Sequence, residues 1–167
     1  TEMSQLRQKK NENDKNKIVF DKNLKNFKLE DIIISHENQS IQLQGLINGK
    51  NTKDIQLTFK DVNLNKVTPD IAKFKFDGKL NGEVFLKQNN AVYQPTASLE
   101  IKDLYVNDNM LGNLFLDIQG NENFNKFSIN SEIENENLKS FRASGGLEIV
   151  NSETIIDLDL SFQKFNL

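Results

Sequence analysis

Residues 74–86 read FKFDGKLNGEVFL, and this stretch decides the fold class. Every second residue, starting at Phe74, is apolar or glycine, whereas the residues between them are polar apart from Phe85. Alternation with a period of two is typical of a β-strand that has one solvated face and one apolar face. A helix does not give this pattern, because residues i and i+2 point to different sides of a helix. The stretch therefore predicts β-structure.

The same alternation returns along most of the chain. It is seen in residues 41–47, 112–120, 127–133, 141–149 and 156–162. The breaks between these runs are rich in Asn, Asp and Gly, as in Asn48–Asn51, and such clusters are typical of turns. The sequence therefore predicts an all-β fold of about 8–12 short strands over residues 18–167. Residues 1–17 carry few apolar side chains and are expected to form a polar, flexible N-terminal segment.

A first internal repeat predicts bends within the strands. The pattern apolar-x-apolar-x-Asp-apolar-x-apolar occurs at residues 27–34, 57–64 and 99–106, and a degenerate copy with Lys in place of Asp occupies residues 160–167. In each copy the apolar parity slips by one residue at the Asp or Lys. Such a slip would turn the rest of the strand inside out, unless an extra residue is accommodated in a β-bulge. We therefore expect a bend or bulge at each of these positions.

A second repeat is built on glycine. Gly45, Gly78, Gly112 and Gly145 each occupy an apolar-face position, and they are separated by 33, 34 and 33 residues. Glycine within a strand marks a bend, a close approach of another backbone or room for a ligand. The sequence leaves these three interpretations open.

Composition argues against several classes of partner. The 167 residues carry a formal net charge of −3, and the one basic cluster, residues 7–10, is interleaved with polar and acidic residues. Nucleic-acid binding is therefore not expected, because phosphate recognition needs uncompensated basic side chains. There is no cysteine, which excludes disulfides and thiolate sites. No apolar run approaches the roughly 18 residues of a membrane span, and we expect the chain to be a piece of a longer protein whose anchor lies elsewhere.

Few residues offer catalytic chemistry. His36 is the sole histidine and lies in a polar stretch that predicts a surface loop. The pairs Asp157 with Asp159 and Glu132 with Glu134 are expected on the polar side of strands, where their carboxylates are hydrated. Residues 107–109 supply oxygen ligands without a recognised calcium-loop spacing. We therefore expect no enzyme activity, no metal site and no cofactor.

What remains is an extended apolar face. Phe occurs 12 times and Trp is absent, so the aromatic side chains are almost purely apolar. Two arrangements fit this face: it packs against a second sheet as a sandwich core, or the curved sheet closes only partly and leaves an apolar groove. For the groove, parity predicts the lining residues Ile41, Leu43, Phe74, Phe76, Leu80, Val84, Leu86, Leu99, Ile101, Leu114, Leu116, Ile118, Phe127, Ile129, Phe141, Leu147, Ile149, Leu158, Leu160 and Phe162.

Four segments in this order resemble the TamB family, the inner-membrane component of the translocation and assembly module, which belongs to the AsmA-like group. They are residues 74–86; residues 94–107, which read QPTASLEIKDLYVN; residues 110–116, which read MLGNLFL; and residues 145–147. The family shows a G-x-L-x-G strand, a Pro-led strand ending in D-L-x-V-N, and two further G-x-L strands in the same order. The resemblance covers residues 20–167, and the Asn and Lys usage is similar to that of Bacteroidetes members.

The resemblance implies a β-taco, an elongated, curved, mostly antiparallel sheet folded into an open groove that is polar outside and apolar inside. It implies a periplasmic location with an inner-membrane anchor outside this chain. Its implied partners are phospholipid or other acyl chains, an Omp85-type outer-membrane protein and neighbouring β-repeats of the same full-length chain. The implied activity is non-catalytic: phospholipid transport to the outer membrane, outer-membrane protein assembly, or both.

Two other functions fit the residues. One is a structural scaffold whose edge strand, near residues 162–167, pairs with a strand of a nascent β-barrel. The other is an adhesin or sugar-binding module with a closed sandwich core and ligand contacts on its loops.

Overall fold

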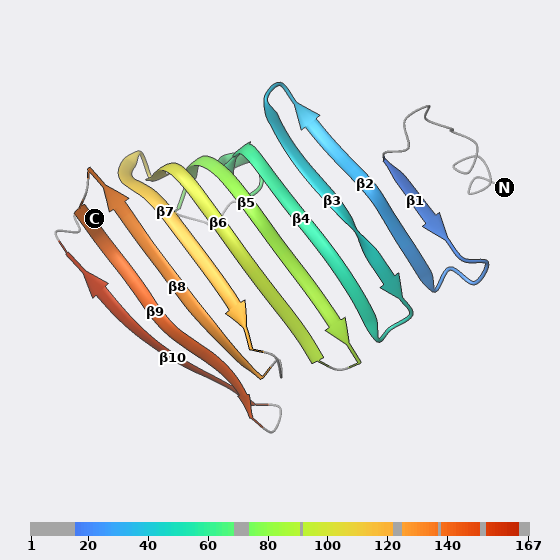
Figure 1. Cartoon of the computed structure of the whole chain (residues 1–167). Helices are drawn as coiled ribbons and strands as arrows, with labels where there is room; N and C mark the ends of the chain where they lie inside the picture. The colour runs from blue at the N-terminus through green and yellow to red at the C-terminus, as the bar shows by residue number, and fades with distance from the viewer. Residues whose placement is uncertain are drawn as a thin grey trace.

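The structure is a computed structural model that describes residues 16–68, 74–90, 92–121, 125–136, 138–150 and 153–163, without the side chain of Ile149. These residues form ten strands and one short 3-10 helix, labelled in Figure 1. The elements are β1 (Lys17–Phe20), β2 (Asn26–His36), β3 (Gln39–Asn48), β4 (Thr52–Asn63), η1 (Leu64–Lys66), β5 (Phe76–Asn89), β6 (Val92–Val106), β7 (Asn109–Gly120), β8 (Lys126–Asn135), β9 (Leu138–Val150) and β10 (Glu153–Phe162).

All ten strands belong to one antiparallel sheet in which each strand pairs with its neighbours in sequence, from β1 to β10. The sheet is open: it is neither closed nor strongly curled (Figure 1). The all-β prediction and the expected number of strands are therefore confirmed. The described residues form no second sheet, so the sandwich arrangement that the sequence left open is not the one observed.

The parity slips are β-bulges at three of the four predicted positions. Asp31, Asp61 and Asp103 each adopt a positive φ of 41–49°. At each of them the register shifts by one extra residue on the bulged strand. The left-handed conformation is open to Asp because its short polar side chain tolerates it. The extra residue returns the following apolar side chains to the same face, as expected. The fourth position, Lys164, lies outside the described residues.

The strand that faces each bulge supplies a glycine and, in two cases, an asparagine. Gly82 pairs with Phe59 beside the bulge of β4, and the next residue, Asn81, accepts a hydrogen bond from the Asp61 N–H at 2.9 Å. Asn113 accepts one from the Asp103 N–H at 3.0 Å in the same way. The bulged N–H groups therefore stay satisfied although they leave the regular ladder.

Gly82 also shows why glycine is required beside a bulge. Its φ is 119°, and a Cβ atom there would lie 2.1 Å from the carbonyl oxygen of Ser98. In the repeat itself, a Cβ atom at Gly45, Gly112 or Gly145 would lie 2.1–2.3 Å from a carbonyl oxygen of the neighbouring strand. Of the three interpretations of the glycine repeat, close backbone approach is therefore the one observed, and these positions leave no room for a ligand. The glycine beside the β4 bulge is Gly82 and not the repeat member Gly78, because β4 pairs Phe59 with Gly82 and Val62 with Leu80.

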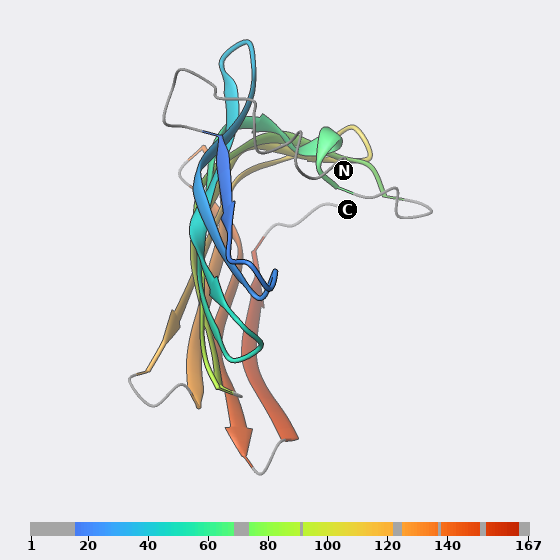
Figure 2. The ribbon, with the colours of Figure 1, turned by 90° about the vertical axis from the view of Figure 1, so that its right-hand side faces the viewer.

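One part of the sheet carries a small core. Leu64 of η1 packs with Leu104 and Ile133, and all three are 6–7% exposed. In Figure 2 the upper ends of the strands coloured green to yellow curve toward the side that carries η1. The helix therefore covers one end of the apolar side of β5–β9, and the strand bends bring that end toward it.

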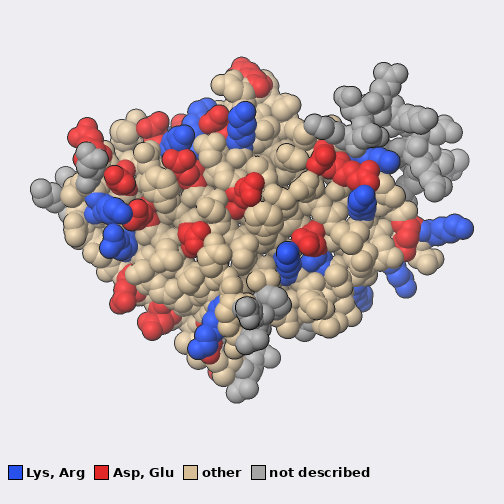
Figure 3. Space-filling model, viewed as in Figure 1, with Lys and Arg blue, Asp and Glu red and all other residues tan. Residues whose placement is uncertain are grey.

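The opposite side of the sheet is polar. It carries ion pairs such as Lys139 with Glu132, at 2.7 Å, and Lys126 with Glu148, at 3.2 Å. Figure 3 looks onto this side, where acidic and basic side chains are scattered and no large region of one sign is present. The two sides of the sheet are called below the apolar face and the polar face.

Candidate functional site: the apolar face

The strand register aligns apolar residues in rows that run across the sheet. Two rows extend over nine strands, from β2 to β10. The first consists of Ile32, Leu43, Leu57, Val84, Ala97, Ile118, Ile129, Gly145 and Leu158. The second consists of Ile34, Ile41, Phe59, Gly82, Leu99, Leu116, Ser131, Ala143 and Leu160. Because paired residues of neighbouring strands point to the same side, each row is a band that is apolar apart from Ser131 in the second row.

The register and the strand parity place the predicted lining residues on this one face. Leu80 and Phe127 are buried there, and most of the others are half-buried. Phe74, Leu158, Leu160 and Phe162 are exposed. Ile149 pairs with Thr154 in the sheet, but its side chain lies outside the described part of the molecule.

The apolar face has no covering layer beyond η1 in the described structure. Among the described residues no side chain there falls below 2% exposure, and only eight hydrophobic residues are buried. The most exposed side chains of this face are Ile34 on β2, which is 69% exposed, and those of β10, where Leu160 is 57% and Phe162 59% exposed. A contiguous apolar surface of this kind is typical of a site that contacts protein, lipid or another apolar ligand.

The predicted set of lining residues omits several members of the face. Ile55, Leu57, Phe59, Ala97 and Ile133 belong to the same rows as the predicted residues. All but Ile133 have an apolar residue two positions away, and Ile133 continues the alternation of residues 127–133, which was the signal available in the sequence. Parity also missed a polar row at one end of the face, in which Lys53 pairs with Gln88 and Gln88 pairs with Tyr93.

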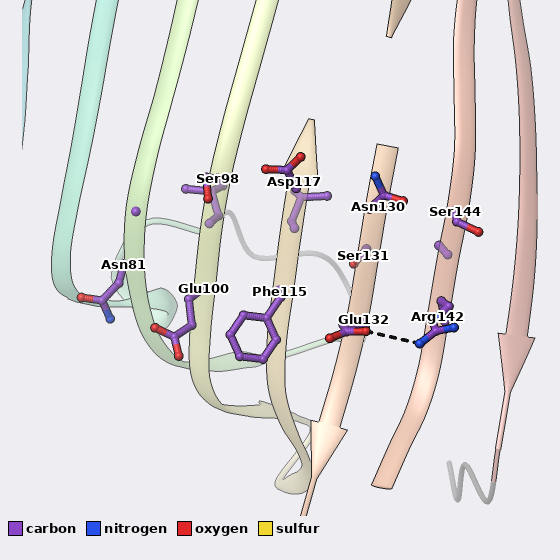
Figure 4. A pocket seen from close by; sticks show the side chains of 14 residues that line it. Asn81, Ser98, Glu100, Phe115, Asp117, Asn130, Ser131, Glu132, Arg142 and Ser144 are labelled. Atoms are coloured by element: carbon purple, nitrogen blue, oxygen red, sulfur yellow. Dashed lines mark ion pairs between the residues drawn. The ribbon is translucent and has the colours of Figure 1, made fainter. Parts of the chain in front are cut away.

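A hollow of about 740 Å³ lies on the polar face over β5–β9 (Figure 4). Phe115 lies near its middle, and Glu100 and Glu132 flank it through the strand register. Arg142 makes an ion pair with Glu132 at 3.7 Å. The hollow is wide open, and its lining does not include the side chains that parity selected, apart from Leu99 and Leu116 in the strands that form its floor.

Electrostatic effects on ionisable groups are confined to the surface. Hydrogen bonding to Lys28, together with the charges of Lys28 and Lys17, lowers the pKa of Glu30. The same hydrogen bond raises the pKa of Lys28. Hydrogen bonds from backbone N–H groups, first that of Lys25, lower the pKa of Asp21. These shifts are those of hydrated ion pairs and turns and do not define a reactive group.

Among the described residues no group of three or more His, Asp or Glu side chains is arranged to hold a metal ion. Nor do these residues include a helix of the length and apolarity that a bilayer crossing demands. His36, the residue on which any histidine chemistry would depend, lies at the β2–β3 hairpin with a largely exposed side chain.

In the described residues, the fold and the site define a single-layer amphipathic β-sheet whose apolar face is covered only by η1. Comparison with known proteins gives no family model, no curated protein and no solved structure that matches the chain.

Proposed function

We propose that the protein is a non-catalytic lipid-binding module of a TamB-like cell-envelope protein, in which the apolar face receives acyl chains. The observation that carries the proposal is the pair of apolar rows that continue across nine strands, over which the described residues form no second sheet. In a longer sheet of the same kind, the repeated bulges would add curvature and fold the face into a β-taco groove.

The dimensions and energetics support this proposal. Strands are spaced about 4.8 Å apart, so a row over nine strands extends roughly 38 Å. One leaflet of a bilayer is about 15 Å thick in its hydrocarbon part, so the face is large enough for whole acyl chains. Burial of each CH₂ group contributes about 0.8 kcal/mol, and a sixteen-carbon chain therefore gains on the order of 10 kcal/mol before entropic losses. Apolar contact is not directional, which suits movement of lipid along the face.

The proposed context is the periplasm, between an inner-membrane anchor outside this chain and an Omp85-type partner in the outer membrane. There the module would support phospholipid transport, outer-membrane protein assembly or both. These parts of the proposal depend on the resemblance of residues 20–167 to the TamB family.

The test is capture of a phospholipid that carries a photoreactive acyl chain. We expect the wild-type chain to crosslink and Leu116→Glu to lose most of the crosslinking, because a carboxylate in the second row is poorly solvated beside an acyl chain. Leu116 is more suitable than Leu80, whose burial would make a charge destabilising. Ser128→Glu places the same charge on the polar face and should crosslink as wild type does. Absence of lipid capture by the wild-type chain refutes the proposal.

One observation favours a second candidate function. β10 is the last strand of the sheet and pairs on one side only within the described residues. An unpaired strand edge is a template for another β-strand, as a scaffold for a nascent β-barrel would require. In that case mutations along β10 would impair function, whereas Leu116→Glu would not.

A further inference from the structure

The polar row at one end of the apolar face stands out from its surroundings. Lys53, Gln88 and Tyr93 are aligned on β4, β5 and β6. Strand parity places them on the same face as Ile55 and Leu86, two residues further along the strands. Outside the bulges and turns, Lys53 is the only charged residue that the register places on the apolar face of the described strands.

The Lys53 ammonium group is available for an anion. Its Nζ lies 5.6 Å from the centroid of the Tyr93 ring, in a cation–π contact that reaches across the intervening Gln88. No carboxylate of the described residues forms an ion pair with it. A cation–π contact at an exposed site is weak, about 0.5–1 kcal/mol, so an anionic group can displace it.

Gln88 supplies the second, independent observation. Its side chain is only 6% exposed, and its Nε2 donates to the carbonyl oxygens of Lys50, at 3.1 Å, and Asn90, at 2.6 Å. Because both partners are acceptors, the orientation of the amide is fixed. The Oε1 atom is buried and has no hydrogen-bond partner among the described residues. A buried acceptor without a donor costs free energy, so a donor supplied by a bound molecule would stabilise the site.

The apolar surface beside this row has the length of an acyl chain. On β5, Leu86, Val84 and Leu80 follow Gln88 on the same face. Each residue of a strand advances about 3.3 Å, so these side chains extend roughly 20 Å along the strand, more than the roughly 15 Å of one bilayer leaflet. The far end of this track is covered by η1. A polar group at one end and a closed apolar end opposite it match the two parts of a lipid.

We propose that Lys53, Gln88 and Tyr93 form the headgroup site of the lipid-binding face and that they select a phosphate-bearing lipid. The phosphate pairs with the Lys53 ammonium, a hydroxyl or ammonium group of the headgroup donates to Gln88 Oε1, and one acyl chain runs along β5 toward η1. This inference rests on the proposed lipid-binding function and adds to it the headgroup class and the direction of the chain.

The experiment compares two photoreactive lipids with the same diazirine-labelled acyl chain, phosphatidylglycerol and diacylglycerol, presented to the full chain in detergent micelles. Lys53→Met keeps the length of the side chain and removes its charge. It should lower crosslinking of phosphatidylglycerol about tenfold, the loss of one charge-assisted hydrogen bond, and leave crosslinking of diacylglycerol unchanged. Lys53→Arg should restore capture of phosphatidylglycerol. Lys87→Met, one residue from Gln88 but on the polar face, should change neither lipid.

The outcomes separate the two proposals. If the wild-type chain captures both lipids and Lys53→Met captures phosphatidylglycerol as well as wild type does, the headgroup site is refuted while lipid binding stands. If the wild-type chain captures neither lipid, the proposed function itself fails. A second readout maps the labelled residues by mass spectrometry. A diazirine at the headgroup should label the Tyr93 segment, and one at the chain end should label β5 near Leu80; the reverse order would contradict the proposed direction.

Discussion

Two regions of the apolar face differ although they share one sheet: the region around η1 and the edge strand β10. Around η1, the side chains of Leu64 in the helix, Leu104 on β6 and Ile133 on β8 are nearly inaccessible to solvent. On β10, Leu160 and Phe162 of the same face are more than half exposed. The residue types are similar, so the difference in burial comes from position: η1 and the strand bend cover one region, whereas β10 has a neighbouring strand on one side only within the described residues.

This comparison shows how a single-layer sheet is stabilised. A strand buries its apolar side chains only partly against those of its neighbours, and complete burial needs a second element over the face. Here a three-residue helix is the only such element in the described structure. The region around η1 should therefore contribute a large share of the stability. The exposed side chains of β10 are left free to contact an external apolar ligand.

The largest expected effect concerns the bend itself. In Gly82→Ala, the new Cβ meets the Ser98 carbonyl oxygen and the φ of 119° becomes strained, so we expect a loss of about 3–4 kcal/mol in the free energy of unfolding. Gly49→Ala is the matched control, because Gly49 lies in a turn with φ of 58° and open space around it. It should cost about 1 kcal/mol. Urea unfolding followed by circular dichroism measures both, and equal costs would show that close backbone approach at the bend is unimportant.

The next effect compares the two regions directly. Leu104→Ala removes a side chain that is 6% exposed in the small core, and we expect a loss of about 3 kcal/mol. Leu160→Ala removes the same atoms from a side chain that is largely exposed, and the loss should be about 0.5 kcal/mol or less. If both variants lose similar stability in urea, β10 is covered in solution and the apolar face is not open there.

The bends were predictable from the sequence because a bulge leaves a simple trace. One extra residue changes the parity of the apolar side chains, and Asp at that position also fits the left-handed conformation that the bulge requires. The candidate face was predictable for the same reason, since the alternation fixes which residues share a side. Leu57 and Ile133 share this alternation, so their absence from the predicted set does not come from a lack of signal in the sequence.

The absence of a second sheet in the described structure was not predictable from parity. Alternation reports that one face is apolar, but a sandwich core and an uncovered face have the same pattern. The polar row was also missed, because Lys53 and Gln88 come from different strands and only the register brings them together with Tyr93. The helix η1 is too short to have a periodic signal, so its cover over the core could not be anticipated.

The smallest expected effect concerns the polar face at the β1–β2 end, which lacks η1. Lys28 forms an ion pair with Glu30 at 2.8 Å, and this contact is the main reason that the pKa of Glu30 is lowered. A lowered carboxyl pKa in the folded state stabilises the fold above the unfolded pKa, and the contribution is lost as the pH falls through the folded value. Lys28→Met should therefore raise the pKa of Glu30 toward its ordinary value. It should also reduce the loss of folding stability that occurs as the pH falls through that pKa. The more distant Lys17, at 3.5 Å, should keep a part of the shift.

NMR titration of the Glu30 side chain measures the change, with Lys126→Met on β8 as the control that should leave the Glu30 pKa unaltered. A Glu30 pKa that is the same in wild type and Lys28→Met would mean that the pair does not persist in solution, and stabilisation of this end would then come from its strand pairing and apolar contacts.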